Sequence, residues 1–285
     1  MKAIVFGGSG FLGSHVCDIL TEAGHEVSLF DWTESKWLHE GQKMIVGDIL
    51  NESDVNNAIE SADIVYNFAG IADIDEAISK PIDTVKYNIL GNTIILEGCR
   101  KHSVKRYIFA SSVYVYSQSG SFYRCSKQAC ESYIENYYYQ YGLEYTILRY
   151  GSLYGSRSDN RNAIYSYIAQ AINDNKIKYN GSHNSLREYI HVEDAALCSL
   201  KILEPEYANK NIILTGHQSM RISDLFKMIS EILRKEIKIE YNVDSETLHY
   251  EITPYSYNPK IGKKMTLPLH IDLGQGLLKI IEELS

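Results

Sequence analysis

The sequence predicts an α/β protein with a doubly wound parallel sheet and a smaller C-terminal lobe. Apolar, strand-like runs alternate with segments of helical spacing through the first half of the 285-residue chain. Such alternation is typical of the crossover units that build a parallel sheet. The run 64–68 is almost wholly apolar, as expected for a strand that is buried on both faces. After Arg149 the alternation loosens, which indicates a second lobe.

The first elements are the most regular. A strand is predicted over Lys2–Phe6, and a glycine-rich turn follows it at 7–13. Apolar residues recur at helical spacing over 11–23, and Gly24 ends that helix. The same criteria predict the other elements of the first half: strands over 27–30, 44–46, 64–68, 106–110 and 145–148, and helices over 55–61, 84–102 and 123–141.

The second half is more mixed. Its predicted elements are helices over 163–173, 193–203 and 222–233, an extended stretch over 187–192 and a strand over 211–214. We expect a sheet domain over residues 1–150, to which segments at about 185–215 cross back. A smaller lobe is expected to be formed mainly by residues 151–285.

Composition and charge exclude some classes of protein. The chain has 28 Lys+Arg and 36 Asp+Glu, a net charge of −8, with 45% hydrophobic and 22% charged residues. These values exclude a disordered or fibrous chain. The acidic balance argues against nucleic acid or an anionic membrane as the main partner, because phosphate binding needs clustered cations. Neither a run of 18 apolar residues nor a signal-peptide pattern occurs, so we expect a cytoplasmic protein.

The cysteines support that expectation. They do not have the spacing of a disulfide framework or of a metal site. We therefore expect small buried side chains in a reducing compartment, and no bound metal. The five are scattered along the chain: Cys17, Cys99, Cys125, Cys130 and Cys198.

The glycine-rich turn predicts a dinucleotide-binding site. Gly7, Gly10 and Gly13 directly follow a strand and open a helix, the context that makes this spacing informative. Gly7 permits a tight turn, Gly10 lets the backbone approach a pyrophosphate, and Gly13 lets the helix pack closely on the strand. Phe11 and Leu12 belong to the same predicted site. The alternative is a turn with a purely structural role.

Acidic and small residues after the next strands extend this site. Asp31 ends the second strand, where a carboxylate accepts hydrogen bonds from a ribose 2′-hydroxyl and repels a 2′-phosphate. This favours NAD over NADP, although Lys36 nearby weakens the preference. Asp48, followed by Ile49, is placed to meet an adenine amino group, and a helix N-cap is its structural alternative. The loop expected to pass under the cofactor is formed by Phe68, Ala69 and Gly70.

Ser112, Tyr123 and Lys127 are the candidate reaction centre. Tyr123 and Lys127 are four residues apart at the start of a predicted helix and share one face, and Ser112 follows the fifth strand. We expect the Lys127 ammonium and a positive nicotinamide to lower the pKa of Tyr123. Its phenolate then takes a hydroxyl proton while Ser112 holds the substrate oxygen. With 23 tyrosines in the chain, the spacing alone is weak evidence, and the position after the fifth strand makes it specific.

With these residues in place, the chain resembles the extended short-chain dehydrogenase/reductase family, in its nucleotide-sugar epimerase/dehydratase branch. The resemblance runs from about Lys2 to about Leu200 and continues more faintly beyond. It implies a Rossmann sheet that binds NAD and a C-terminal lobe that binds a nucleotide-diphosphate sugar. Besides the residues above, it rests on Pro81 and the segments 88–92, 111–116, 141–143, 148–150, 154–157 and 187–194.

The resemblance also implies roles for single residues. Ser112, Tyr123 and Lys127 are implied to be the catalytic trio, the last two also contacting the cofactor. Asn88 and the backbone after Tyr150 are implied to line the nicotinamide.

Two arginines are implied to meet the substrate. Arg187 is implied to grip the diphosphate, since a planar guanidinium suits phosphate, and Arg157 is a weaker phosphate candidate. An ion pair of Arg187 with Glu188 or Asp194 is the structural alternative.

Three departures from the family pattern bear on function. Dehydratases of the family carry an acidic pair after the catalytic Ser/Thr, where this chain has Val113 and Tyr114. This argues against a 4,6-dehydratase. Ser152 stands where epimerases usually have an asparagine that contacts the substrate phosphate. The loop 113–122 is also shorter than usual, which implies a differently shaped sugar pocket.

The leading hypothesis is an epimerase that transiently oxidises C4 of the sugar. A 4-keto-sugar reductase or a C4 dehydrogenase uses the same trio and stays open, and a non-catalytic NAD-binding relative is a further class. Tyr133, Tyr137 and Tyr141 recur along one helix face. Because family members usually dimerise through this helix, we expect a homodimer.

Overall fold

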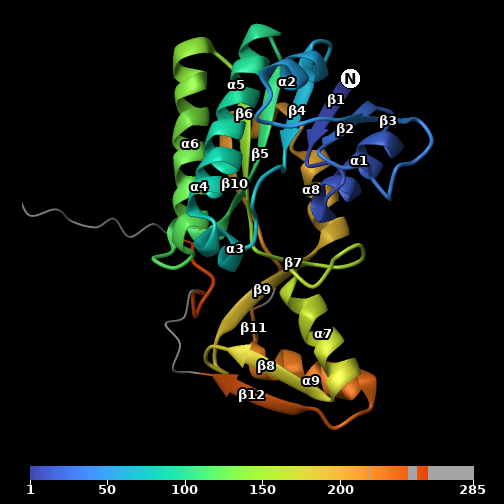
Figure 1. Cartoon of the computed structure of the whole chain (residues 1–285), viewed down its shortest axis with the longest axis vertical. Coiled ribbons are helices and arrows are strands. Elements are labelled where there is room, and N and C mark those ends of the chain that lie inside the picture. The colour runs from blue at the N-terminus through green and yellow to red at the C-terminus, as the bar shows by residue number, and fades with distance from the viewer. Residues whose placement is uncertain (218, 243–248, 256–285) are drawn as a thin grey trace, which may run out of the picture.

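The central element is a seven-stranded parallel sheet, which confirms the predicted fold class. The computed structural model describes residues 1–217, 219–242 and 249–255. The strand order is β10-β6-β5-β4-β1-β2-β3, and all the pairings are parallel. The strands are β1 (Lys2–Phe6), β2 (Glu26–Asp31), β3 (Gln42–Val46), β4 (Ile64–Asn67), β5 (Arg106–Ser112), β6 (Tyr145–Tyr150) and β10 (Lys210–Leu214). The strand at 210–214 thus crosses back to the sheet, next to β6 (Figure 1).

Helices cover both faces of this sheet. Helices α1 (Phe11–Glu22) and α8 (Val192–Lys201) pack together on one face. Helices α2 (Glu52–Ile59), α5 (Gly91–Lys101) and α6 (Ser121–Tyr141) cover the other face. Successive side chains of a strand point to opposite faces, so the apolar strands supply two separate cores. The first is shared with α1 and α8, and the second with α2, α5 and α6.

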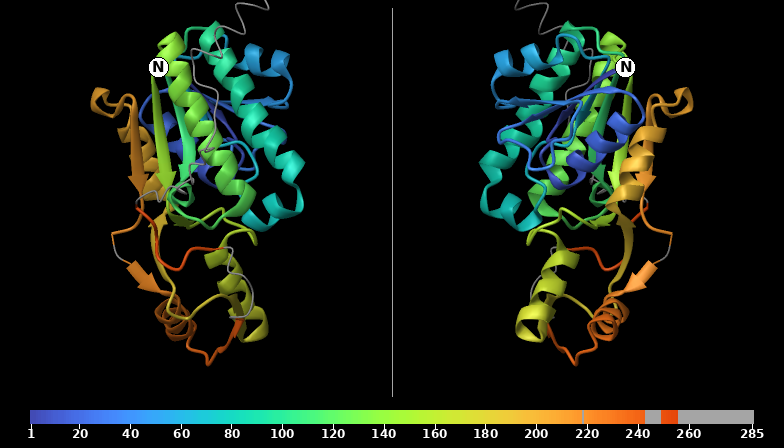
Figure 2. Two further views of the ribbon diagram at one scale, coloured as in Figure 1. Left: turned by 90° about the vertical axis from the view of Figure 1, so that its left-hand side faces the viewer. Right: turned by 90° about the vertical axis from the view of Figure 1, so that its right-hand side faces the viewer.

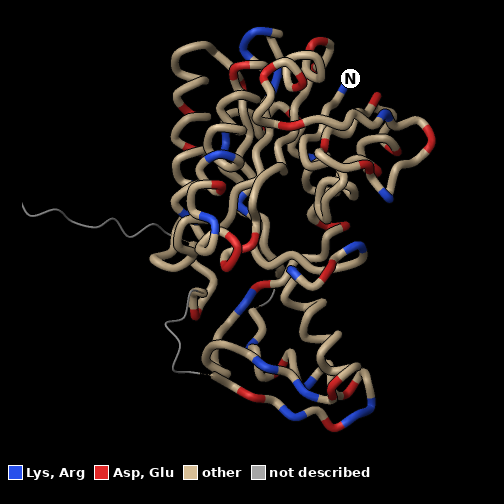
Figure 3. Tube along the Cα trace, in the orientation of Figure 1, with Lys and Arg blue, Asp and Glu red and all other residues tan. Residues whose placement is uncertain are grey.

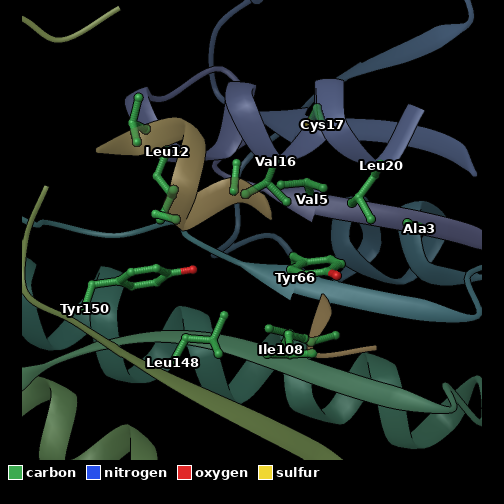
Figure 4. Packing of buried hydrophobic residues seen from close by; sticks show 14 of the residues in the cluster. Ala3, Val5, Leu12, Val16, Cys17, Leu20, Tyr66, Ile108, Leu148 and Tyr150 are labelled. Carbon is green, nitrogen blue, oxygen red and sulfur yellow. The ribbon is translucent and has the colours of Figure 1, made fainter. Parts of the chain in front are cut away.

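Two tyrosines anchor the first of these cores. Figure 4 shows Tyr66 and Tyr150 among Leu148, Leu12 and Val16 between the sheet and α1. The Tyr66 hydroxyl donates to the carbonyl of Ser199 (2.8 Å), and the Tyr150 hydroxyl shares a hydrogen bond with the Ser199 hydroxyl (2.7 Å). Both polar groups are therefore satisfied inside the apolar layer, and they tie β4 and β6 to α8.

The second lobe has its own small core. Helices α7 (Ala163–Asp174) and α9 (Ile222–Leu233) pack on the parallel pair β8 (Lys176–Asn180) and β12 (Lys238–Asn242) around Tyr179 and Phe226. A three-stranded sheet of β11 (Ser219–Arg221), β9 (Leu186–His191) and β7 (Ser152–Tyr154) connects this lobe to the central sheet (Figures 1 and 2). Basic and acidic residues alternate over both lobes (Figure 3).

Several short elements of the structure were not predicted from the sequence. The helix predicted over 84–102 begins as α4 (Pro81–Thr84), continues through a π-helical turn (Val85–Leu90) and ends as α5, and α3 (Ile74–Ser79) precedes it. Two 3₁₀ turns, Val113–Tyr116 (η2) and Pro205–Tyr207 (η3), were also not predicted. Strands β7, β8, β11 and β12 have only three to five residues each, which makes them hard to recognise in the sequence.

Among the described residues, no helix has the length and apolarity needed to cross a membrane. In the same part of the chain, no cluster of His, Cys, Asp and Glu has the arrangement of a metal site. Residues 256–285, which belong to the lobe predicted over 151–285, lie outside the described ranges.

Candidate active site

The turn after β1 is shaped by backbone-to-backbone contact. Gly7 has φ +78°, and a Cβ there would lie 2.8 Å from the amide nitrogen of Ala69. A Cβ on Gly13 would lie 2.1 Å from the carbonyl oxygen of Gly7, so no other residue fits either position. Gly10 is the N-cap of α1 and has no side chain to cap it. The first N–H groups of α1 therefore stay available for an anion, while Phe11 and Leu12 direct their side chains into the core.

Asp31 is held against this turn. One carboxylate oxygen accepts from the Ser9 amide (3.0 Å) and the other from the Trp32 amide (2.8 Å). Burial raises the pKa of Asp31, and these hydrogen bonds oppose the rise. The carboxylate also accepts from the Thr33 backbone. Three of its roughly four acceptor sites are thus used, and one remains for a ribose hydroxyl.

Asp48 lies exposed after β3. Its side chain accepts from the Leu50 amide (2.9 Å), and helix α2 is capped by Asn51, so the N-cap alternative for Asp48 is wrong. Ile49 is buried, and its side chain leaves no room for a Cβ on Gly91. The Asp48 carboxylate is thus free for a ligand at the rim of the site.

The Asn88 side chain is hydrogen-bonded to the loop that follows β4. Its side-chain oxygen accepts from the Ile71 amide (2.7 Å), and its nitrogen donates to the Ile71 carbonyl (3.0 Å) and the Ser126 hydroxyl (2.9 Å). Gly70 has φ +132°, and a Cβ there would lie 2.6 Å from the Asn88 oxygen. Asn88, in the π-helical turn, therefore joins the loop 68–71 to α6, and contact with the nicotinamide stays a prediction.

Ser112, Tyr123 and Lys127 are brought together at the carboxyl end of β5. The side chains of Ser112 and Tyr123 are hydrogen-bonded, and the Ser112 hydroxyl also accepts from the Tyr114 amide (3.3 Å). The Lys127 ammonium donates to the Ala110 carbonyl (2.7 Å) and lies 5.7 Å from the centroid of the Tyr123 ring. Ser112 and Lys127 are buried, and Tyr123 is partly exposed.

Burial has the largest effect on the pKa values of Tyr123 and Lys127. Burial raises the pKa of Tyr123 to about 12, and the hydrogen bond with Ser112 only partly opposes this rise. Burial also lowers the pKa of the Lys127 ammonium. Lys127 is not among the groups that affect the pKa of Tyr123 in this structure. The expectation that Lys127 and a positive nicotinamide together lower this pKa stays a prediction. Lys127 turns its ammonium to a carbonyl of β5 rather than to the phenol oxygen.

Arg187 lies buried on β9 without a carboxylate partner among the described residues. One of its terminal nitrogens donates to the carbonyls of Leu186 (3.0 Å) and Glu251 (3.2 Å). Its guanidinium lies 4.6 Å from the centroid of the Tyr250 ring. The alternative of an ion pair with Glu188 or Asp194 is thus absent from the described contacts. The second terminal nitrogen has no hydrogen-bond partner among the described residues, which suits an anionic ligand.

The other predicted substrate residues have different surroundings. Ser152 on β7 is hydrogen-bonded to Tyr250. Arg157 has φ +64° and pairs with Asp18 of α1 (2.7 Å), with its guanidinium 5.0 Å from the Trp37 ring. The structure therefore brings Arg187 and Ser152 to Tyr250 and directs Arg157 to α1, so the substrate role of Arg157 stays a prediction.

Three residues of the site were not singled out as site residues from the sequence. The Tyr114 ring meets Tyr123 edge-on at 6.2 Å and Tyr250 at 4.6 Å. Its hydroxyl shares a 2.6 Å hydrogen bond with His249. Tyr114 is two residues from Ser112, a signal that could have been used. His249 and Tyr250 arrive from a distant segment that carries no recognisable motif.

Taken together, the fold and the site define a doubly wound α/β enzyme that binds a dinucleotide. The residues fit NAD, because the glycine turn leaves the start of α1 open and Asp31 offers acceptors beside it. The chain belongs to the NAD dependent epimerase/dehydratase family, whose sequence model matches residues 3–214. Its cofactor is NAD.

Individual relatives are distant but similar over almost their whole length. A putative UDP-glucose 4-epimerase of Methanocaldococcus jannaschii is 26% identical over 98% of this chain and 96% of that protein. The UDP-glucose 4-epimerase of Thermotoga maritima with UDP-glucose superposes with a TM-score of 0.83, at 24% identity over 90% of each chain. The Thermus thermophilus UDP-glucose 4-epimerase in complex with NAD gives a TM-score of 0.81, at 22% identity over 92% of this chain and 95% of that one.

Asp31→Asn is expected to weaken NAD binding by about tenfold and to reduce the discrimination against NADP, because a charged acceptor for the ribose is lost. Trp32 directly follows Asp31 and donates its amide to that carboxylate, so tryptophan fluorescence can report titration of cofactor-stripped protein. Asp224→Asn, at an exposed position on α9, is the matched control. Unchanged preference in Asp31→Asn would contradict the assignment.

Proposed function

We propose that the protein is an NAD-dependent nucleotide-sugar 4-epimerase. The observation that carries the proposal is the Ser112–Tyr123–Lys127 cluster at the sheet edge beside the glycine turn. Membership of the family supports it, and the UDP-sugar epimerases among the relatives favour a UDP-hexose as substrate.

Ser112, Tyr123 and Lys127 have different roles in the reaction at C4 of the sugar. Ser112, hydrogen-bonded to Tyr123, orients the C4 hydroxyl, and the Tyr123 phenolate takes its proton. Bound NAD supplies the hydride acceptor and donor at C4 and a positive charge that favours the phenolate. Lys127, fixed by the Ala110 carbonyl, holds a positive charge behind the Tyr123 ring. After the 4-keto sugar has turned over, Tyr123 returns the proton to the oxygen at C4.

The same site lacks the groups that a dehydratase uses. Water elimination from the ring needs a further acid and base near C5 and C6, and the family places a carboxylate pair after the catalytic serine. Here Val113 is fully buried and Tyr114 packs against Tyr250. An epimerase needs no such pair, so these positions favour epimerisation.

The substrate is held between the two lobes in this proposal. The sheet domain, residues 1–150 with the returning segment, binds NAD through Gly7–Gly13, Asp31, Asp48 and the loop 68–70. The lobe over 151–285 binds the nucleotide sugar, with Arg187 at the diphosphate and Ser152 beside it. Free cysteines throughout the chain support a cytoplasmic location.

We also propose a homodimer formed through α5 and α6. Tyr133 and Tyr141 are exposed on α6, whereas Tyr137 is buried and donates to Glu97 of α5 (2.7 Å). Only the first two therefore remain for a partner. Exposed aromatic side chains are enriched in interfaces.

Tyr123→Phe is expected to lower kcat by about 10²–10⁴-fold while NAD stays bound, because only the hydroxyl that moves the proton is removed. Turnover of UDP-glucose to UDP-galactose and the cofactor content of the purified variant provide the measurement. Tyr133→Phe makes the same change at an exposed position of the helix and leaves both values unchanged. Activity close to wild type in Tyr123→Phe would refute the mechanism.

Arg187→Met is expected to raise KM for the nucleotide sugar by about 10–100-fold, since charge-assisted hydrogen bonds to the diphosphate are lost. Steady-state kinetics give the effect, and NAD content should not change. Arg221→Met, at an exposed position of neighbouring β11, serves as the control. A normal KM in Arg187→Met would remove this residue from the substrate site.

In solution the protein is expected to have about twice the chain mass of 32.4 kDa. Tyr133→Asp should shift the population to monomer by placing a charge in the interface, and sedimentation velocity measures this shift. Tyr139→Asp, on a more exposed residue of the same helix, should leave the dimer intact. A monomeric wild-type protein would disprove the dimer.

A further inference from the structure

A buried charged cluster lies behind the trio and has no part in the mechanism above. It consists of Glu131 on α6, Arg149 on β6, Ser111 on β5 and Tyr116 in the 3₁₀ turn η2 that follows Ser112. We call it the Glu131 cluster. Glu131 is 7% exposed, and the Arg149 side chain is similarly covered.

Every group of the Glu131 cluster is hydrogen-bonded. The Ser111 hydroxyl donates to one Glu131 oxygen (2.5 Å), which also accepts from Arg149 Nε (3.0 Å). The other Glu131 oxygen accepts from Arg149 Nη2 (2.6 Å). Arg149 Nη1 donates to the Tyr116 hydroxyl, and the guanidinium lies 4.8 Å from the centroid of the Tyr116 ring. Each of the three guanidinium nitrogens thus donates a hydrogen bond within the cluster.

Stability alone does not account for this arrangement. A buried ion pair loses so much hydration that apolar residues of similar size often stabilise a protein as well or better. What the pair does provide is a fixed geometry, because a bidentate Arg–carboxylate pair tolerates little displacement.

The Glu131 cluster joins the elements that carry the trio. Ser111 precedes Ser112 and pairs in register with Arg149, just as Ser112 pairs with Tyr150. Glu131 is one helical turn beyond Lys127, which is itself one turn beyond Tyr123. Through Arg149 the cluster also holds Tyr116, and with it the short loop after Ser112.

Glu131 also affects the charge of Lys127. The groups around the Lys127 ammonium are Tyr123, Cys130 and Glu131 from its own helix, and Phe109 and Ala110 from β5. Arg149 of β6 and Tyr116 of η2 lie beyond Glu131. Burial lowers the pKa of Lys127, and the negative charge of Glu131 opposes that effect.

We propose that Glu131, held by Arg149, is a positioning residue for the proposed reaction: it fixes Ser112 through Ser111 and keeps Lys127 protonated behind Tyr123. This inference rests on the proposed function for its kinetic consequences. Its structural consequence, the protonation of Lys127, does not depend on any substrate.

Glu131→Gln is the first test, because the amide keeps the shape and removes the charge. The variant leaves the Arg149 cation uncompensated, so the pKa of Lys127 should fall. We expect kcat to drop at least about tenfold, with the alkaline limb of its pH profile moved to lower pH. KM and NAD content should stay within about threefold of wild type. Glu135→Gln, one turn further along α6 and only partly buried, should change none of these values.

Two further variants separate charge from geometry. Glu131→Gln combined with Arg149→Met removes both charges, so the pKa of Lys127 should return towards the wild-type value while kcat stays low. Arg149→Lys keeps the charge but loses the fork, so kcat should fall with little change in that pKa. If circular dichroism shows that Glu131→Gln does not fold, Arg149→Lys still tests the proposal.

The pKa of Lys127 can be measured without turnover. Protein labelled with ¹³C at the lysine ε-carbon is titrated by NMR in the NAD-bound form, and the Lys127 signal is identified by its loss in Lys127→Met. A reduced kcat in Glu131→Gln with the pKa of Lys127 unchanged would overturn the proposal in favour of a merely structural role. A normal kcat in Glu131→Gln would also overturn the proposal. If wild-type protein turns over no nucleotide sugar, the proposed function fails, and the NMR titration still decides the role of Glu131.

Discussion

The close approach of three backbone segments at Gly7 is the constraint on which the site depends. Gly7 touches both Gly13 at the start of α1 and the loop after β4, where Cβ atoms would clash. That loop is held by Asn88, whose side chain also reaches Ser126, the neighbour of Lys127. A continuous set of contacts therefore runs from the turn predicted to bind the cofactor to the helix of the proposed base. A shift of either would displace the other, which explains why small residues occupy this edge of the sheet.

The trio and Arg187 have surroundings of different physical character. The trio lies in a desolvated region where burial opposes both the phenolate and the ammonium. Productive ionisation of Tyr123 therefore requires nearby charge as well as position. Among the described residues, Arg187 is held by the carbonyls of Leu186 and Glu251 and by the face of Tyr250 instead of by a carboxylate. Its charge is consequently not neutralised by the described residues, a property that suits an anionic substrate.

The sequence predicted the sheet, most helices and the trio because these depend on local signals. Periodicity located β1, β4 and β5, and the glycine spacing and the Tyr123–Lys127 interval can be recognised in one short segment each. Long-range features escaped prediction. Nothing near His249 or Tyr250 indicates that they meet Tyr114, and the short strands β8 and β12 pair across about 60 residues. The burial that raises the pKa of Tyr123 depends on neighbours that the sequence does not reveal.

Transfer of the hydrogen at C4 tests the central claim most directly. UDP-glucose and UDP-N-acetylglucosamine carrying deuterium at C4 would be incubated with purified protein and no added cofactor, and the products examined by NMR. Epimerisation by transient oxidation predicts the C4 epimer with its deuterium still at C4. Loss of the deuterium to solvent, or a 4-keto product without any epimer, would contradict the account.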